Sequence, residues 1–244
     1  MSLRAVHAGT GYQYLLRSVA THDADPKGQS LSDYYAAKGT PAGRWIGSGL
    51  EGLNSDKASA GEVVTEAQMA ALYGEGLHPD TDEKMLGGAP LAGCKLGRAF
   101  RVYSGGVDVL EAVADAERAF LNTEKRRPTV DERGQIAELV GRPFYTEKFG
   151  YEHASGKDVI AWINRERDQV KQAVAGFDFT FSPVKSVSVL WALADEETSS
   201  KVAALHHEAV AEALSWAEDN AVYTRVGTNG IEQVRTRGII ASEF

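Results

Sequence analysis

The chain has 244 residues, 43% of them hydrophobic and 25% charged, which is typical of a folded protein with a hydrophobic core. Its formal net charge of −8 argues against nucleic-acid binding in general but is compatible with a local basic groove. A single cysteine excludes an internal disulfide framework and a cysteine-cluster zinc site, and favours a cytoplasmic location. No apolar run approaches the roughly 18 residues of a membrane helix, and the N-terminus lacks a signal-peptide pattern, so we expect no membrane insertion.

The first part of the chain, residues 1–80, is rich in glycine and tyrosine and predicts short helices. One covers residues 12–20, and a second begins after Asp33 and is stopped by the glycine and proline that follow. A third opens at Thr65, a favourable N-cap residue, and is ended by Gly74 and Gly76, because glycine readily takes the left-handed conformation that terminates helices.

Residues 81–175 are more polar and mostly helical in pattern. Residues 105–128 carry apolar residues at helical spacing up to Pro128, which cannot continue a helix. Residues 156–176 predict a second amphipathic helix, whose buried stripe is expected to consist of Val159, Ile160, Ile163, Val170 and Val174. We expect this region to be a helical insertion that packs on, or covers, the rest of the fold.

The stretch GFDFTFSPVKSVSVLWAL changes from strand-like alternation to helical spacing. Side chains alternate across a strand, so Phe177 and Phe179 share one face and Asp178 lies on the other. We expect the phenylalanine face to lie in the core. Ser182 followed by Pro183 is a favourable helix start, with serine as the N-cap and proline in the first turn.

The first turn of that helix is a candidate phosphate site. Lys185, Ser186 and Ser188 lie near its N-terminus, where backbone N–H groups and a cation favour an anion. A solvated polar face with an ordinary cap explains the same pattern, so both interpretations stay open.

The last part of the chain, residues 176–244, combines this strand and helix with a long amphipathic helix over residues 197–221. Residues 221–244 then predict a strand, a turn at Thr-Asn-Gly and a second strand. The order strand, helix, helix, strand, strand predicts an α+β fold with an antiparallel sheet core and flanking helices.

Four tyrosines, Tyr12, Tyr14, Tyr34 and Tyr35, cluster beside glycine-rich segments. Each alone is best explained as a core residue with a satisfied hydroxyl, but tyrosine can also act as a covalent nucleophile. Ionising a free phenol at pH 7 costs about 4 kcal/mol, so such a tyrosine needs a metal ion or a base close by. Asp178 could supply or orient that base.

The stretches FDFTFSPVKSVSVLWAL, HHEAVAEALSWAE and VRTRGIIASEF occur in this order, after GYQYLLRSVA, DYYAAKGTPAGRWIGSGLEGL and GEGLHP. Together they resemble the TrwC-type conjugative relaxases of the MOB-F class, and within it the actinobacterial branch. The resemblance covers essentially the whole chain and is weakest in the helical region. It implies a relaxase palm of the HUH type, with residues 1–80 as its N-terminal, tyrosine-bearing part.

This resemblance implies a DNA-nicking transesterase. A tyrosine hydroxyl would attack one phosphodiester at the origin of transfer, leaving a 5′-phosphotyrosine link and a free 3′-OH. Tyr14 best matches the first tyrosine of the family, with Tyr12 as a close rival, whereas Tyr34 and Tyr35 match the second pair, assigned to later strand transfer or DNA contact. Asp178 matches the aspartate that helps to activate the nucleophile or orients a metal-ligand histidine.

A divalent metal, Mg or Mn, held by three histidines is also implied by the resemblance. The histidine motif of the family follows the strand that RTRGIIASEF resembles, and this chain stops at Phe244. His206 and His207 are neighbours on a helix and point about 100° apart, so we interpret them as surface or interface histidines. We expect the metal ligands to lie outside this chain, which alone should bind metal weakly and nick poorly.

Single-stranded DNA of the transfer origin is the partner that the resemblance implies, with conjugation accessory proteins as further candidates. Candidate phosphate contacts are Arg17, Arg44, Lys185, Arg235 and Arg237, and Trp45 could stack on a base. Each also has an ordinary interpretation as a solvated charge or a core aromatic. A non-catalytic single-stranded DNA-binding or interaction module with the relaxase fold stays open as the alternative function. A replication initiator or transposase fits the Asp-x-Thr-Phe-Ser stretch less well.

Overall fold

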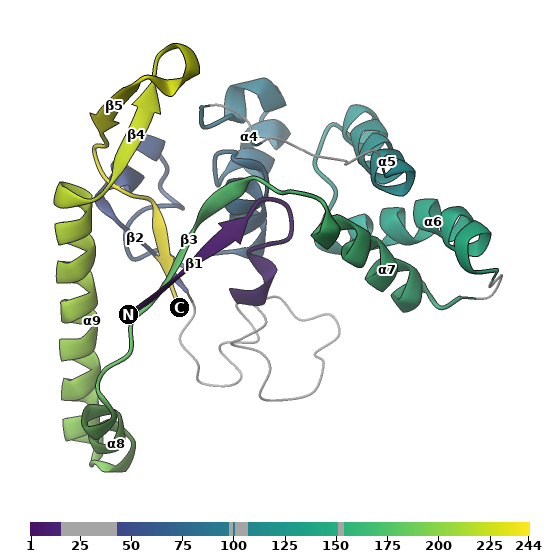
Figure 1. Cartoon of the computed structure of the whole chain (residues 1–244). Coiled ribbons are helices and arrows are strands. Elements are labelled where there is room, and N and C mark those ends of the chain that lie inside the picture. Colours follow the sequence, from purple (N-terminus) through teal and green to yellow (C-terminus); the bar gives the residue numbers. More distant parts are fainter. Residues whose placement is uncertain (16–42, 98–99, 101–106, 151–153) are drawn as a thin grey trace. The chain divides into compact units, whose positions relative to one another are not determined.

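The computed structural model describes residues 1–15, 43–97, 100, 107–150 and 154–244, which form small sheets and helices (Figure 1). The strands pair two by two: β1 (Ser2–His7) with β3 (Val174–Thr180), β2 (Arg44–Ile46) with β6 (Ala241–Glu243), and β4 (Tyr223–Val226) with β5 (Glu232–Arg235). The β2–β6 and β4–β5 pairs are antiparallel. This combination of helices and antiparallel strand pairs confirms the predicted α+β class.

The chain divides into two compact units. The helical unit consists of Val6–Leu16 and Glu66–Gly176, and the strand unit of Met1–Ala5, Arg17–Thr65 and Phe177–Phe244. The predicted helical region 81–175 falls within the helical unit. The division of the sequence into residues 1–80, 81–175 and 176–244 stays a prediction.

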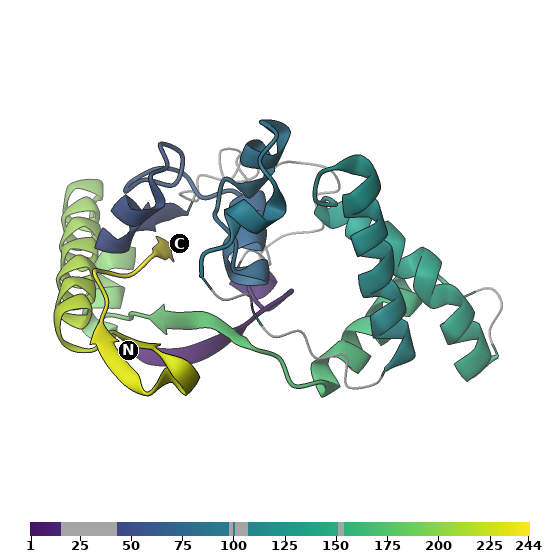
Figure 2. The ribbon, with the colours of Figure 1, turned by 90° about the horizontal axis from the view of Figure 1, so that it is seen from above.

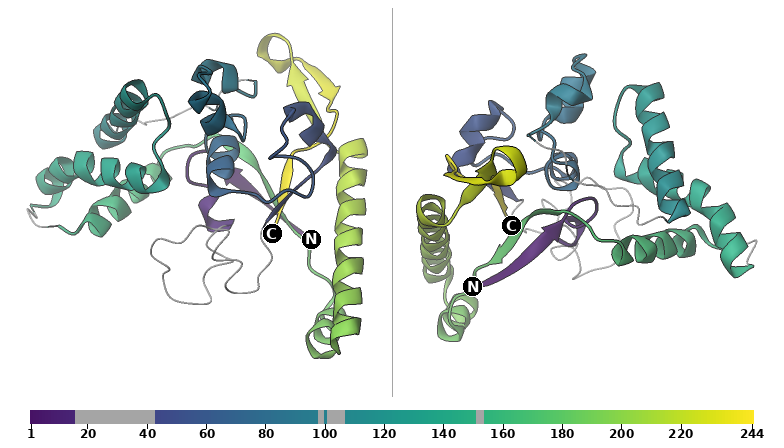
Figure 3. Two further views of the ribbon diagram at one scale, coloured as in Figure 1. Left: turned by 180° about the vertical axis from the view of Figure 1, so that it is seen from behind. Right: turned by 45° about the horizontal axis from the view of Figure 1, so that its top comes forward.

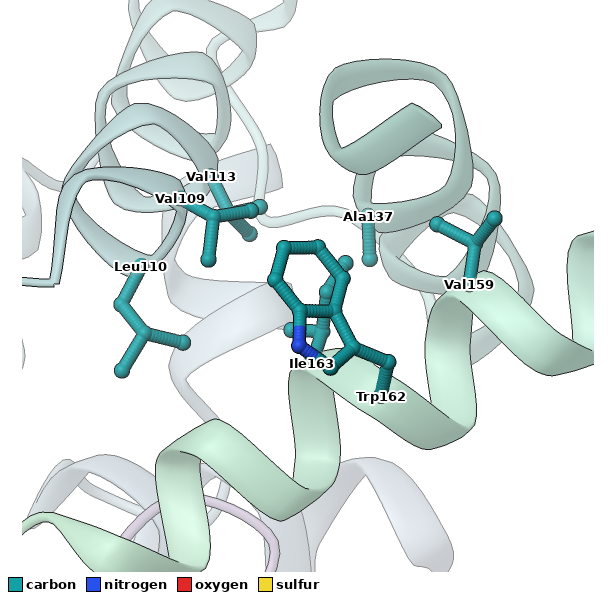
Figure 4. Packing of buried hydrophobic residues seen from close by; sticks show 7 residues of the cluster. All are labelled: Val109, Leu110, Val113, Ala137, Val159, Trp162 and Ile163. Atoms are coloured by element: carbon teal, nitrogen blue, oxygen red, sulfur yellow. The ribbon is translucent and has the colours of Figure 1, made fainter. Parts of the chain in front are cut away.

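Three packed helices form the core of the helical unit: α5 (Asp108–Glu124), α6 (Val130–Phe149) and α7 (Gly156–Gln169) (Figure 3). They bury a common set of side chains, namely Val109, Leu110, Val113, Ala137, Val159, Trp162 and Ile163. In Figure 4 the Trp162 ring lies among side chains of all three helices. Its indole N–H donates to Glu166 Oε1 at 2.7 Å, so the polar edge of this core residue is satisfied.

Side-chain caps explain where α6 and α7 begin. Thr129 and Glu132 form a capping box at the start of α6, directly after Pro128. Arg126 donates two hydrogen bonds to the Glu132 carboxylate, at 2.7 and 2.6 Å, and together with the Thr129 amide holds its pKa at about 2. Ser155 caps α7 by accepting the Asp158 amide.

The predicted helix over residues 156–176 is shorter in the structure. Val159 and Ile163 are buried as predicted, but α7 ends at Gln169 because Val170 takes an extended conformation. Val174 lies in β3 and is 48% exposed, so its assignment to the helical stripe was wrong. The branched residue suits the pleated strand as well as the helix, and the pairing of β3 with β1 decides between them.

The helical unit also contains shorter segments around its glycines. α3 (Glu66–Met69) begins directly after Thr65 and continues as the π-helical η2 (Ala70–Glu75). η2 ends at Gly76 in the left-handed conformation (φ 70°), as predicted, whereas Gly74 lies inside the helix and does not end it. α4 (Thr81–Leu86) and η3 (Leu91–Cys94) follow. Of the predicted helix over 12–20, residues 13–15 are helical, and the rest lies outside the described residues, as does the helix expected after Asp33.

The strand unit contains η1 (Ser48–Leu53), α8 (Lys185–Leu193), the long α9 (Glu196–Asn220) and the predicted hairpin of β4 and β5, joined through η4 (Thr228–Gly230). Figure 2 shows α9 followed by this hairpin. The Glu218 carboxylate on α9 accepts the amides of Ser48 and Ile239, each at 2.9 Å. Burial alone would raise the pKa of Glu218, but these hydrogen bonds outweigh it and hold the pKa below its usual range.

The phenylalanine face of β3 does not lie in a core, contrary to the prediction. Phe177 is 59% and Phe179 41% exposed, whereas Asp178 on the other face is half-buried. Alternation correctly assigned these residues to opposite faces. It carried no information on which face another layer covers, and among the described strands β3 pairs with β1 alone.

The start of α8 also differs from the prediction. Val184, in an extended conformation (φ −62°, ψ 152°), is the N-cap residue, so the helix begins at Lys185 and not at Pro183. Ser182 therefore does not cap it. The proline could stand in a first helical turn, but its fixed φ is equally compatible with the extended segment found here.

Gly141 on α6 generates a stability prediction, because a Cβ there would lie 2.3 Å from Ile163 Cδ1 and 3.1 Å from Val159 Cγ1. We expect Gly141→Val to lower the free energy of unfolding by about 1–3 kcal/mol through overpacking of the α6–α7 contact. Gly134→Val on the same helix is the control, since a Cβ there meets no atom within 4 Å, and should change stability by no more than about 0.5 kcal/mol. Equal urea midpoints for the two variants would contradict this packing.

Candidate functional site

The first tyrosines lie on a turn that follows β1, here called the tyrosine turn (residues 8–15). Its backbone is fixed within the helical unit: the Ala8 amide donates to the Ala173 carbonyl and the Gly9 amide to the Gly74 carbonyl, each at 2.8 Å. Gly9 has a φ of 82°, a conformation that glycine takes without strain. The turn then closes into a short helical segment, with the Leu15 amide donating to the Tyr12 carbonyl at 3.0 Å.

Tyr12 is a buried residue of this turn, with 3% of its surface exposed. Its ring packs against Gly74, where an added Cβ would lie 3.5 Å from Tyr12 Cε1. Burial raises the pKa of its hydroxyl, and the charge of Glu66 raises it further, while Arg133 and Arg127 act in the opposite direction without outweighing them. Tyr12 is therefore held as a neutral phenol, which is a poor nucleophile.

Tyr14 is half-buried, on the helical residues 13–15. Of the two rival tyrosines it is thus the more accessible to a ligand. Tyr34, Tyr35 and Arg17 lie outside the described residues.

Asp178 lies near the end of β3 and is half-buried, with exposed phenylalanines on either side in sequence. It belongs to the strand unit, whereas Tyr12 and Tyr14 belong to the helical unit. The proximity of Asp178 to the attacking tyrosine therefore stays a prediction.

The candidate DNA contacts that the structure describes all lie in the strand unit. Lys185, at the first residue of α8, and the pair Arg235 and Arg237 are exposed. Arg44 is also exposed, although its guanidinium donates to the Gly61 carbonyl. Trp45 is completely buried, which favours its alternative interpretation as a core aromatic over base stacking.

The described residues do not fit a divalent metal: they contain no cluster of three histidine, cysteine or acidic side chains that could hold one. His207 is exposed and its Nδ1 lies 2.6 Å from Glu243 Oε1, while the ring of His206 lies against Trp191. His78 is buried, and its Nδ1 accepts the Asp80 amide at 3.0 Å. These histidines have structural partners of their own.

A group that the sequence analysis did not identify lies beside the tyrosine turn. Glu75, the last residue of η2, accepts hydrogen bonds from Arg127 and Arg133, which flank the start of α6. Arg127 has only 5% of its side chain exposed and also pairs with Asp82 at 3.2 Å. These partners are 52 and 58 residues from Glu75 in the sequence, and no short-range pattern indicates such a pairing.

Comparison with known families assigns the chain to one of them. The model of the family described as TrwC relaxase matches residues 8–244. The chain belongs to the TrwC relaxase family. The match begins at the tyrosine turn and includes Asp178, and it gives the protein a DNA relaxase function in general terms. Neither a comparison with curated proteins nor one with solved structures found a match.

Membership of the TrwC relaxase family indicates a DNA-binding protein of conjugation whose relatives generally use a divalent metal. Among the residues that the structure describes, no helix is both long and apolar enough to cross a bilayer.

The environment of Tyr12 generates a pH prediction. Because its pKa is raised in the fold, the stability that the neutral phenol contributes is present below its ordinary pKa of about 10 and is lost as the pH rises through the folded-state value. Urea denaturation between about pH 9 and pH 11 should therefore show a steeper loss of stability for the wild type than for Tyr12→Phe. Tyr223→Phe, which changes a tyrosine that is 45% exposed, should retain the wild-type slope.

Proposed function

We propose that this protein nicks single-stranded DNA at an origin of transfer in plasmid or integrative-element conjugation, with Tyr14 as the nucleophile. The observation that carries the proposal is the relaxase-family match, which starts at residue 8 and so includes the tyrosine turn. The half-burial of Tyr14, in contrast to the full burial of Tyr12, supports the choice between the two.

The proposed reaction is a transesterification at phosphorus. The Tyr14 oxygen forms a bond to the scissile phosphate, the bond from phosphorus to the 3′ oxygen breaks, and that oxygen takes up a proton as the free 3′-OH. The product is a 5′-phosphotyrosine, so the energy of the phosphodiester is kept for rejoining. No oxidant or nucleotide is consumed.

The phenolic proton must leave as Tyr14 attacks, since ionising a free phenol at pH 7 costs about 4 kcal/mol. We assign Asp178 the role of accepting this proton or of orienting the base that does. Its half-buried position on β3 supports a carboxylate held by the fold. We assign Tyr34 and Tyr35 to the later strand-transfer step, and no step to a metal ion.

The DNA strand is proposed to lie against exposed basic residues of the strand unit: Arg44, Lys185, Arg235 and Arg237. Contacts of this kind read the phosphate backbone and not the base sequence. They would give the protein a local basic surface despite its net charge of −8.

A suicide substrate of single-stranded origin DNA, with Mn²⁺ present, tests the nucleophile on this chain and on a form that continues past Phe244. We expect the longer form to give a covalent protein–DNA adduct, Tyr14→Phe to abolish it, and Tyr12→Phe to retain it. Loss of the adduct in Tyr12→Phe alone would assign the nucleophile to Tyr12. If the longer form binds DNA but gives no adduct, the alternative of a non-catalytic single-stranded DNA-binding module is the correct one.

The DNA surface is tested by the salt dependence of binding to the same strand. The logarithm of the binding constant falls linearly with the logarithm of the salt concentration, with a slope of about −0.7 for each phosphate contact on a single strand. The slope should therefore become less steep by about 0.7 in each of three variants: Lys185→Ala, Arg235→Ala and Arg237→Ala. Lys201→Ala is the matched control, because this exposed lysine on α9 is already paired with Glu197 at 2.7 Å. If the slope changes in Lys201→Ala and in none of the other three variants, the proposed surface is refuted.

A further inference from the structure

Beside the hydrogen bond from the Ala8 amide to the Ala173 carbonyl, the tyrosine turn contacts the end of η2. The Gly9 amide donates to the Gly74 carbonyl at 2.8 Å, and an added Cβ at Gly74 would lie 3.1 Å from the Gly9 oxygen. The Tyr12 ring packs on the same glycine. The tyrosine turn is therefore packed against, and hydrogen-bonded to, the backbone at Gly74.

The residue after Gly74 fixes that backbone. Glu75 is the last residue of η2, and its Oε1 accepts from Arg127 Nη2 at 2.8 Å, from Arg127 Nε at 3.2 Å and from Arg133 Nη2. We call these three residues the arginine clamp. Both arginines lie next to the first turn of α6, whose start is set by the Thr129 capping box and whose interior packs in the three-helix core.

The Glu75 carboxylate of the arginine clamp lies between two positively charged guanidinium groups. Burial would raise the pKa of Glu75, but the positive charges and hydrogen bonds of Arg127 and Arg133 outweigh it, so the pKa lies below its usual range and the carboxylate stays ionised. Removing this negative charge leaves Arg127, whose side chain is 5% exposed, paired with Asp82 at 3.2 Å. The arginines would then move, and η2 with them.

η2 is a π-helical turn, a rare conformation that occurs mostly as single turns within α-helices and frequently at functional sites. The side chain of its last residue, Glu75, is bound by Arg127 and by Arg133 of α6, a helix that packs in the three-helix core. A continuous chain of contacts therefore links α6 to the tyrosine turn. Arg133 of α6 binds Glu75, the neighbouring Gly74 contacts Gly9 and Tyr12, and Tyr14 follows two residues later.

We propose that Glu75, held by Arg127 and Arg133, is a positioning residue that sets the conformation of the tyrosine turn and thereby the presentation of Tyr14 to DNA. This rests on the proposed function for Tyr14. None of the three residues touches the reacting atoms; they act through the backbone of η2.

Hydrogen–deuterium exchange on the whole chain tests the positioning without requiring activity. In Glu75→Gln the amides of Gly9 and Leu15 should exchange at least tenfold faster, while the amides of α7 keep their wild-type rates. The matched control is Glu138→Gln, which removes a glutamate paired with Arg142 on α6, away from the turn. It should leave Gly9 and Leu15 unchanged.

Two further variants keep the test decisive if Glu75→Gln folds poorly. Arg133→Lys retains a charge that can reach Glu75, so the Gly9 amide should stay protected from exchange. Arg133→Met has a side chain of similar length but no charge, so the Gly9 amide should lose its protection. Unchanged exchange at Gly9 in both Glu75→Gln and Arg133→Met overturns the proposal. So does an equal loss of protection throughout α5–α7, which would mean a general role in stability.

The adduct assay separates this proposal from the proposed function. If Tyr14 is the nucleophile, Glu75→Gln should slow adduct formation at saturating DNA at least tenfold with unchanged DNA affinity. An adduct that forms at the wild-type rate in Glu75→Gln refutes the positioning role and leaves the nucleophile assignment intact. If the wild type gives no adduct but the exchange results hold, the proposed function fails and the positioning of the turn stands.

Discussion

The carboxylate of Glu75 links parts of the chain that no local signal brings together. It joins the end of the π-helical turn η2 to two arginines 52 and 58 residues further along, which flank the start of a helix that packs in the three-helix core. The backbone next to Glu75 then supports the turn that bears Tyr12 and Tyr14. The three-helix core of α5, α6 and α7 is thus connected, through Glu75, to the segment with which the relaxase-family match begins.

The parts of the fold that could be predicted from sequence are those specified by neighbouring residues. α5, α9 and the β4–β5 hairpin have apolar spacing or turn residues of their own, and the predictions for them are confirmed. The errors share a different cause. The extent of α7, the start of α8 and the exposure of Phe177 depend on which strand pairs with β3 and which layer covers it. Periodicity carries neither kind of information.

In the candidate site, too, part could be predicted from the sequence and part depends on tertiary packing. The motif residues Tyr14 and Asp178 could be proposed from sequence, since the match to a family depends on residue types in order, and their roles stay predictions. The difference in exposure between Tyr12 and Tyr14 could not be predicted, because it arises from the burial of the Tyr12 ring against Gly74. Likewise Trp45, a reasonable stacking residue by type, is completely buried.

Gly74 has an evolutionary consequence. A Cβ at this position would approach the Gly9 oxygen tightly, at 3.1 Å, and would make an ordinary van der Waals contact with the Tyr12 ring, at 3.5 Å. In relatives that carry a larger residue at the equivalent of position 74, the facing backbone has to shift by a few tenths of an ångström. Positions 9, 12 and 74 should therefore covary, and a family comparison can look for the fingerprint of the tyrosine turn in the middle of the chain as well as at its beginning.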